Sequence, residues 1–174
     1  MKKHLIFLLV LGLFSMTANS QLAVFKALGK NAKDYKLGIG GFAYWSIPLN
    51  EAGNNVLMLE LVELGYFQVK DDVDREGKAY GSIKIGFKHI FSEEGSTGFY
   101  IEPAAGWGIV TGSDLPSERG LAIALEGGYS WELGSNGNNL NVGLKYEADL
   151  ASPEQRIYAI GLKISYSFRL FGGR

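Results

Sequence analysis

The stretch GFYIEPAAGWGI, residues 98–109, alternates between two kinds of side chain. Its odd-numbered positions are apolar and mostly bulky, while its even-numbered positions are small except for Tyr100 and Glu102. A period of two is that of a β-strand, whose successive side chains point to opposite faces of the sheet. The bulky uncharged face suits contact with lipid, and the small and charged face suits a narrow barrel interior. The stretch therefore predicts one strand of a transmembrane β-barrel.

The same alternation recurs after Gln21, and no window there sustains the helical spacing of apolar residues. Each alternating segment has about 11 to 15 residues, whereas strands of globular proteins usually have about 5 to 6. We expect strands at 36–46, 56–68, 79–91, 98–110, 120–133, 139–150 and 156–170. The chain is therefore predicted to be all-β, forming a single antiparallel up-and-down transmembrane barrel.

The alternation assigns most charged residues of these strands to the barrel interior. The predicted inward set contains Lys84, Lys88, Lys145, Lys163, Glu102, Glu126, Glu132 and Glu147. The residues expected to face lipid include Ile85, Leu125, Leu144 and Leu162. An eight-stranded barrel is only wide enough for its side chains to fill, and charges buried singly are costly. We therefore expect paired charges in a filled lumen without a large pore. The alternative is a narrow solute path through the same charges.

The segment 56–68 does not keep one register, because Glu60 and Glu63 fall on opposite faces of a regular strand. A β-bulge inserts one extra residue and so reverses the alternation. A bulge near Leu61-Val62 would turn both acids inward. It would leave on the outward face Leu57, Leu59, Leu64 and Tyr66. The alternative is a strand edge exposed to water.

The alternation predicts seven strands, but single-chain bacterial barrels have an even number of strands. Residues 22–30 are the candidate for the eighth strand, although their sequence would also suit a short helix. With eight strands, both termini lie at the periplasmic end, together with the connections near 48–55, 92–97 and 134–138. The connections at 30–35, 70–78, 111–119 and 151–155 then face outward. This arrangement predicts an aromatic girdle at the periplasmic strand ends, made of Trp45, Phe91, Phe99, Trp131 and Phe168.

Composition narrows the classes of function. The 174 residues are 47% hydrophobic and 20% charged, which fits one domain. The 24 glycines show no collagen period, and 4 prolines are too few for a disordered Pro/Gly tract. The absence of cysteine excludes disulfides, thiolate metal sites, a cysteine nucleophile and a lipid-modified N-terminal cysteine. A net charge of −1 disfavours nucleic acid as a partner.

Residues 1–20 have the pattern of a cleavable signal peptide. Lys2 and Lys3 precede the apolar run Leu5–Phe14, and small residues stand near Ser20. This run has about 10 residues, whereas a membrane-spanning helix needs about 20. We therefore expect a secreted chain whose mature barrel domain, residues 21–174, begins near Gln21.

On these features the chain resembles the small eight-stranded outer-membrane β-barrels of Gram-negative bacteria, particularly the outer-membrane barrel domains of Bacteroidota-type bacteria. The residues that carry the resemblance are the Ser20-Gln21 junction, LGIGG at 37–41, the glycine-punctuated strands and ISYSF at 164–168. The resemblance implies insertion into the outer membrane by machinery that reads an aromatic near the chain end, here Phe168 or Phe171. We further expect a monomer whose partner is outer-membrane lipid. The family includes structural anchors, adhesion factors, small-solute channels and lipid-modifying enzymes.

Three local patterns resemble functional motifs. Gly38–Gly41 lacks the basic residue and following helix of a phosphate loop, so close backbone packing in a curved strand is expected. Asp71–Gly77 lacks the ligand spacing of a calcium loop, which favours a solvated loop over a weak cation site. His89, the only histidine of the mature chain, is expected on the lipid-facing side near Phe91 and is not expected to be catalytic. We therefore expect no catalytic, cofactor-binding or metal-ligating residues, and no cofactor.

Three functions follow as hypotheses. The first is a non-enzymatic outer-membrane barrel with a structural or interaction role and a side-chain-filled lumen. The second is a soluble secreted barrel that binds an apolar ligand, as lipocalins do. The third is a lipid-modifying outer-membrane enzyme. The sequence identifies no particular ligand.

Overall fold

The computed structural model describes residues 20–29, 32–71, 73, 77–92, 95, 97–112, 115–134, 138–151 and 156–167. The predicted signal peptide before Ser20, and the aromatic residues Phe168 and Phe171, lie outside the described residues. The same holds for most of the acidic stretch between Asp71 and Gly77.

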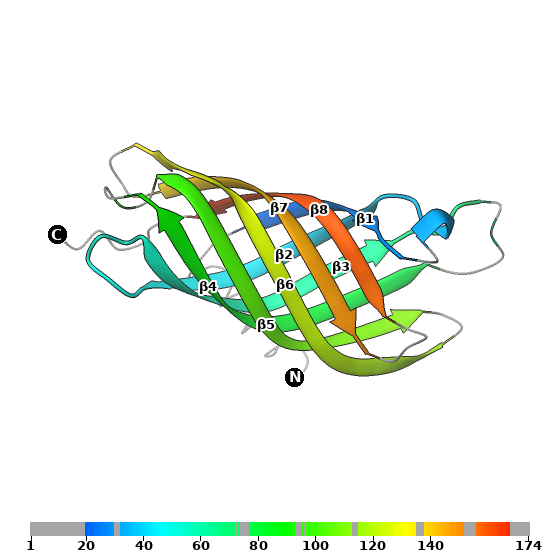
Figure 1. Ribbon diagram of the computed structural model, residues 1–174. Coiled ribbons are helices and arrows are strands. Elements are labelled where there is room, and N and C mark those ends of the chain that lie inside the picture. The colour runs from blue at the N-terminus through cyan, green and yellow to red at the C-terminus, as the bar shows by residue number, and fades with distance from the viewer. Residues whose placement is uncertain are drawn as a thin grey trace, which may run out of the picture.

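Eight antiparallel strands close into one barrel, in which each strand pairs with the next and β1 pairs with β8 (Figure 1). The strands are β1 (Ser20–Ala27), β2 (Gly38–Pro48), β3 (Asn55–Phe67), β4 (Lys78–Phe91), β5 (Gly98–Gly112), β6 (Leu115–Leu133), β7 (Asn138–Leu150) and β8 (Ile157–Ser167). A 3-10 helix, η1 (Ala32–Asp34), follows β1. Among the described residues, no helix has the length and apolar character needed to cross a bilayer. The predicted all-β up-and-down barrel is confirmed.

The eighth strand is β1. The prediction of a strand within residues 22–30 is therefore confirmed, and the short-helix alternative is wrong. Val24 pairs with Ile39 on β2 and with Leu162 on β8. Without β1, the edges of β2 and β8 would keep rows of unpaired backbone groups. Pairing on both sides therefore overrides the weak local preference of this segment for helix.

The two ends of the barrel differ in their connections. One end, called here the turn end, carries the connections 49–54, 92–97 and 134–137, and both Ser20 and Ser167 lie there. The other end, the loop end, carries 28–37, 68–77, 113–114 and 151–156, and it lies on the right in Figure 1 with η1. The connection 49–54 is long for a turn. It is held by Asn50, whose side-chain amide donates to Asn54 Oδ1 at 2.6 Å, and by Gly53 at φ 70°.

β5 and β6 continue into the stretch predicted as a loop at 111–119, which corrects that prediction. Val110 pairs with Glu118, and Gly112 pairs with Leu115. At the loop end β6 extends beyond β7, whose last residue, Leu150, pairs with Leu121 (Figure 1). The alternation of apolar and polar residues did not predict this extension, because the segment contains polar side chains such as Ser117. Backbone pairing continues there because a strand outside the apolar band can carry polar side chains on both faces.

The predicted bulge in β3 is confirmed, and the exposed-edge alternative is wrong. The register with β4 passes from Glu60↔Lys84 to Glu63↔Ser82. Leu61 and Val62 between them are both exposed, while Glu60 and Glu63 are both buried. The extra residue thus returns both carboxylates to the interior.

The two faces of the sheet follow the predicted assignment. The four residues expected on the outward face are exposed, namely Ile85, Leu125, Leu144 and Leu162. The glycines of the 38–41 segment lie within β2, and a Cβ on Gly40 would stand 2.9 Å from Phe25 Cε2. This confirms close packing, rather than a phosphate loop, as the role of the segment.

Candidate functional site in the barrel interior

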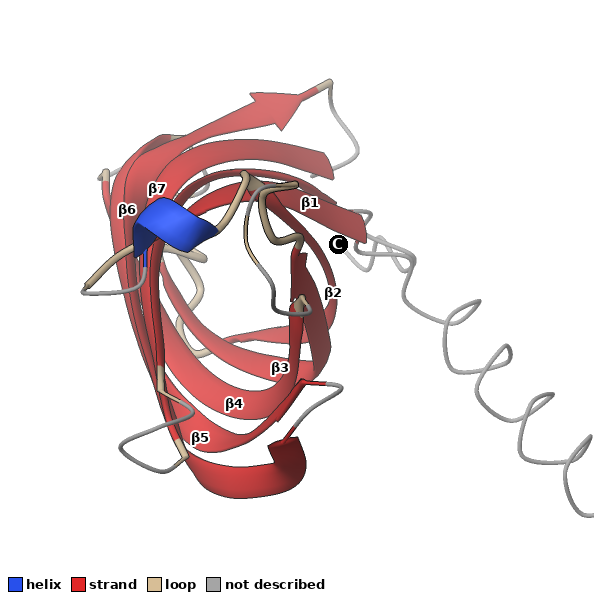
Figure 2. Ribbon diagram, turned by 90° about the vertical axis from the view of Figure 1, so that its right-hand side faces the viewer, coloured by secondary structure: helices blue, strands red, loops and turns tan. Residues whose placement is uncertain are grey.

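Apolar residues fill the barrel interior toward the loop end. This apolar plug consists of Phe25, Phe42, Phe67, Tyr80, Val110 and Ile157 with Ala23, Ala27 and Ala159. The rings of Phe67 and Tyr80 stack at 6.0 Å between centroids, and Phe25 meets Tyr80 edge-on at 6.4 Å. Tyr35, after η1, packs against the plug and reaches Phe67 at 6.2 Å. Figure 2 shows η1 lying across the loop end of the barrel.

The middle of the interior is a cluster of buried charges, which we call the central cluster: Lys84, Lys145, Glu60, Glu63 and Glu147. Lys84 Nζ lies 3.1 Å from Glu60 Oε2 and 2.6 Å from Glu147 Oε1, and it also bonds the Glu63 carboxylate. Lys145 Nζ lies 3.0 Å from Glu63 Oε1, 3.7 Å from Glu147 Oε2 and 3.8 Å from Glu60 Oε1. Both ammonium groups therefore contact the same three carboxylates.

Neutral hydroxyl groups complete the central cluster. Ser82 Oγ donates to Glu63 Oε2 at 3.2 Å and accepts from Lys84 Nζ at 2.9 Å. The Tyr80 hydroxyl donates to Glu147 Oε2 at 3.4 Å. Tyr80 thus belongs to the apolar plug through its ring and reaches the charges with its hydroxyl. Buried charges are tolerated when they are both paired and hydrogen-bonded. Glu63 and Glu147 meet both conditions, whereas Glu60 has ion-pair contacts only.

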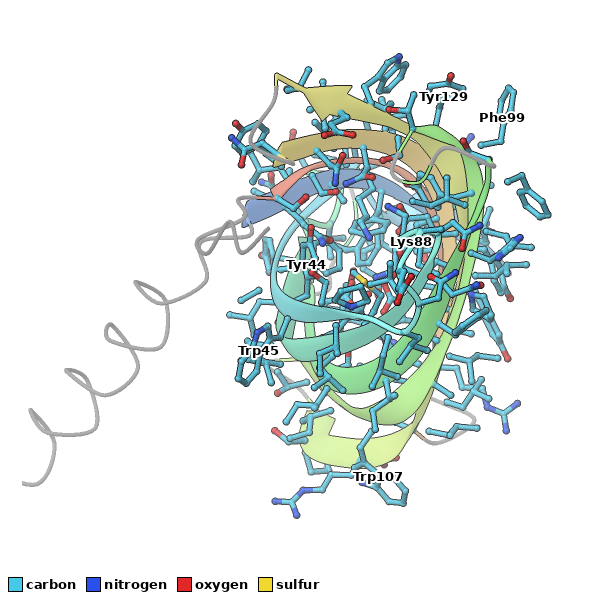
Figure 3. The ribbon with its side chains drawn as sticks, turned by 90° about the vertical axis from the view of Figure 1, so that its left-hand side faces the viewer. Tyr44, Trp45, Lys88, Phe99, Trp107 and Tyr129 are labelled. Atoms are coloured by element: carbon cyan, nitrogen blue, oxygen red, sulfur yellow. The ribbon has the colours of Figure 1, made fainter. Side chains whose placement is uncertain are left out.

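A second polar layer lies closer to the turn end. Lys163 pairs with Glu126, which also accepts a hydrogen bond from the Tyr100 hydroxyl. Lys88 Nζ donates to Asn141 Oδ1 at 2.5 Å and sits 4.0 Å from the centre of the Tyr100 ring. The Asn141 amide in turn donates to Ser165 Oγ at 3.0 Å. In Figure 3, which views the turn end, Tyr44 and Lys88 point into the barrel while Trp45, Phe99 and Tyr129 point away from it.

The predicted inward set is found buried in the interior with one exception. Glu132 is exposed at the turn-end rim, since it lies two positions beyond Ser130, the last buried residue of β6, and one position before the end of the strand. The central cluster also contains Glu60 and Glu63, which the predicted bulge turned toward the interior. Asp149 was missed, although it follows Glu147 by two positions in β7 and the same alternation would have found it.

Asp149 differs from the three paired carboxylates of the central cluster. Its side chain is 1% exposed, and neither carboxylate oxygen has a hydrogen-bond partner among the described residues. The buried charged residues are four lysines, Lys84, Lys88, Lys145 and Lys163, and six acids, Glu60, Glu63, Glu102, Glu126, Glu147 and Asp149. The described interior therefore holds more carboxylates than ammonium groups.

His89 lies near the turn end and contacts neutral groups. Its Nδ1 is 2.8 Å from Asn55 Oδ1, and its ring meets Phe91 edge-on at 4.7 Å. Exposed Asp71, at the start of the acidic stretch, pairs with Lys36 at 2.8 Å. The described residues contain no group of three or more His, Cys, Asp or Glu placed to hold a metal ion.

The aromatic girdle is present at the turn end on the outward face. Phe91 and Phe99 pair across β4 and β5, and Phe99 meets Tyr129 edge-on at 5.0 Å. Tyr129 then contacts Trp131 at 4.7 Å. Trp45 is half exposed on β2, and Phe168 lies outside the described residues. The position of the girdle is thus confirmed for the described members.

The interior is arranged to hold the barrel walls together. Lys84 on β4 and Lys145 on β7 both bond Glu63 on β3, and Lys163 on β8 bonds Glu126 on β6. The pairs Lys145–Glu63 and Lys163–Glu126 join strands that are not neighbours in the sheet, whereas Lys84 and Glu63 lie on adjacent strands. Preorganised charges of this kind serve as crosslinks inside a narrow barrel.

Solved structures share this fold, while sequence comparisons find no relative. No protein-family model matches the chain, and no curated protein sequence matches it. The barrel is similar to neisserial surface protein A (NspA), with a TM-score of 0.67 and 11% identity over 87% of this chain and 95% of that one. It is also similar to the outer membrane enzyme PagL, with a TM-score of 0.52 and 16% identity over 84% of this chain and 97% of PagL. At these identities the likeness concerns the fold alone.

Proposed function

We propose that this chain is a non-enzymatic integral protein of the bacterial outer membrane, secreted with a cleavable signal peptide, with a structural or interaction role and a filled lumen. The observation that carries the proposal is the outward face. Large apolar residues stay exposed all around the barrel, among them Leu22 at 73%, Phe99 at 69% and Ile39 at 65%. Soluble monomers rarely expose contiguous apolar surface of this kind, whereas a lipid-facing band requires it.

The barrel interior argues against the soluble lipocalin-like alternative. A carrier of an apolar ligand needs a mostly apolar cavity. The middle of this interior is instead occupied by the central cluster, whose lysines each contact three carboxylates. Rings of the apolar plug pack against one another.

A non-enzymatic role is supported by the surroundings of the groups most suited to catalysis. Histidine catalysis needs a nucleophile and an orienting third group within hydrogen-bond reach. The described partner of His89 is an asparagine amide oxygen. The likeness to PagL concerns the shared barrel and assigns no reactive group to this chain.

Fractionation of the full chain expressed in a Gram-negative host tests the proposal. The protein is expected in the outer membrane, released only by detergent, and the unboiled band should migrate differently from the boiled band. Recovery in the periplasm without detergent would contradict the proposal. The purified barrel is also expected to leave labelled outer-membrane lipid unchanged. If the wild-type protein releases or transfers an acyl chain, and His89→Ala abolishes this activity but keeps the gel shift, the protein is a lipid-modifying enzyme instead.

A further inference from the structure

The outward face carries its cations at one end only. Within the described strands, the exposed lysine and arginine residues are Lys26 on β1 and Arg119 on β6, and exposed Arg156 stands directly before β8. All three lie at the loop end. The one exposed acid of the described strands is Glu132, which lies at the turn end. The turn end presents the aromatic girdle instead.

The strand register places these three cations along one continuous part of the rim. Lys26 pairs with Ile160 on β8, four positions beyond Arg156. Leu150 ends β7 beside Leu121, and Arg119 lies two positions from Leu121 toward the loop end. With strands about 4.8 Å apart and about 3.4 Å per residue, neighbouring members of the set are roughly 10 to 15 Å apart at the backbone. We call Lys26, Arg119 and Arg156 the rim cations.

The rim cations stand on an apolar background. Lys26 lies between exposed Val24 and exposed Leu28, and Arg119 is followed on its face by exposed Leu121. None of the three rim cations forms an ion pair with a described residue. A long cationic side chain on a lipid-facing surface lays its stem on the apolar band and carries its charge to the interface. In an inserted barrel this would hold the charges at the depth of the lipid headgroups.

We propose that the rim cations bind phosphate groups of lipid headgroups in the leaflet at the loop end. This rests on the proposed membrane insertion. Phosphate suits both kinds of rim cation. Lysine binds phosphate as a point charge, and arginine can donate two parallel hydrogen bonds to it. Clustered lysine and arginine beside a lipid-facing surface attract anionic headgroups. The aromatic girdle at the opposite end suits an interface that is recognised by amphipathic rings rather than by charge.

The test compares lipid retention by the full barrel and by a triple variant, Lys26→Gln, Arg119→Gln and Arg156→Gln. Each protein is purified in detergent, mixed with a phosphorylated glycolipid or its dephosphorylated form, and examined by native mass spectrometry. The triple variant is expected to lose at least about tenfold in retention of the phosphorylated form. Retention of the dephosphorylated form should be equally weak for both proteins. The matched control is Lys33→Gln, since exposed Lys33 lies at the same end on η1 but off the strand faces.

Three results would overturn the lipid site. Equal retention of the phosphorylated lipid by the triple variant would show that the rim cations do not bind it. An equal loss in Lys33→Gln would show that any charge at the loop end suffices. Displacement of the lipid by millimolar inorganic phosphate would assign the site to free phosphate instead. If the triple variant lacks the folded gel band, the single variants R119Q and R156Q provide the same comparison.

Failure of the lipid site can be distinguished from failure of membrane insertion. A protein that needs detergent and shows the gel shift, but retains both lipid forms alike, is an integral barrel without this site. A protein that is soluble without detergent removes the premise of insertion, and with it the lipid site.

Discussion

Glu63 on β3 and Lys145 on β7 form an ion pair of 3.0 Å across the barrel interior, although 82 positions separate them in the sequence. β3 and β7 are not neighbours in the sheet. Hydrogen bonds between backbones hold each strand to the next, and this ion pair holds one wall of the barrel to another. The stability of the barrel is therefore expected to depend on the central cluster as well as on the strand ladders.

Lys84→Met should destabilise the barrel strongly. The replacement keeps a long side chain but removes one of the two ammonium groups that contact all three carboxylates of Glu60, Glu63 and Glu147, and leaves only Lys145 to neutralise them. Breaking a buried ion pair from one side costs about 3 to 5 kcal/mol. Urea unfolding of the barrel in lipid vesicles, followed by the gel shift, measures the change.

Lys36→Met is the control for Lys84→Met. Lys36 pairs with Asp71 at 2.8 Å, but the Asp71 side chain is 90% exposed. Exposed ion pairs contribute about 0 to 1 kcal/mol. Equal losses in the two variants would show that burial of the central cluster has no energetic consequence.

Asp149→Asn should leave the free energy of unfolding unchanged or raise it by up to about 2 kcal/mol. The carboxylate is buried, both oxygens lack described hydrogen-bond partners, and the interior holds an excess of acids. Removing the negative charge therefore removes a desolvation cost without breaking a described contact. The same urea unfolding measures the change. A loss of unfolding free energy as large as that of Lys84→Met would show that the Asp149 carboxylate makes a stabilising contact.

Leu144→Arg should cost about 2 to 4 kcal/mol, since an arginine on the lipid face near mid-membrane is poorly solvated. Leu144 is 55% exposed and pairs with Leu162 in the middle of the outward face. Leu133→Arg is the matched control, because exposed Leu133 ends β6 at the turn end, where the cost should fall to about 0 to 1 kcal/mol. Equal, small costs at both positions would indicate that the outward face contacts water.

Gly40→Ala should destabilise the barrel by about 1 to 3 kcal/mol through overpacking. Its Cβ would stand 2.9 Å from Phe25 Cε2 and 3.1 Å from the Leu64 carbonyl oxygen. The adjacent Gly41→Ala is the control, since the nearest atom to its Cβ would be the Gln21 carbonyl oxygen at 3.8 Å. Thermal loss of the folded gel band compares the two variants. Gly40→Ala should lose the folded band at a lower temperature than Gly41→Ala, and the opposite order would contradict the overpacking.

The wild-type barrel should show no stable large conductance steps in a planar bilayer. The apolar plug and the central cluster lie in series along the interior, and a barrel of eight strands has room for little besides its own side chains. Reproducible large steps from protein that carries the gel shift would contradict the filled lumen. Small steps that disappear in a variant of the central cluster would favour the narrow solute path.

The sequence by itself predicted the strands, their two faces and the bulge. Side-chain alternation is a local property of an extended chain, so the outward position of Leu144 and the inward position of Lys84 can both be read without knowing their neighbours. The opposed faces of Glu60 and Glu63 were enough to require a bulge, because only an extra residue restores the period. Even β1, whose own pattern is weak, followed from the need for an even strand number.

Only the tertiary structure decided which inward residues meet. Closure of the barrel sets the depth of each residue along the lumen, and this depth depends on the stagger between strands rather than on local sequence. For this reason Glu132, which has the inward alternation, lies exposed at the rim, while Asp149 is buried without a hydrogen-bond partner among the described residues. The contact between Lys145 and Glu63 likewise arises because closure brings β3 and β7 to face each other. Alternation thus determines the side of the sheet on which a charge lies, and closure of the barrel determines its partner.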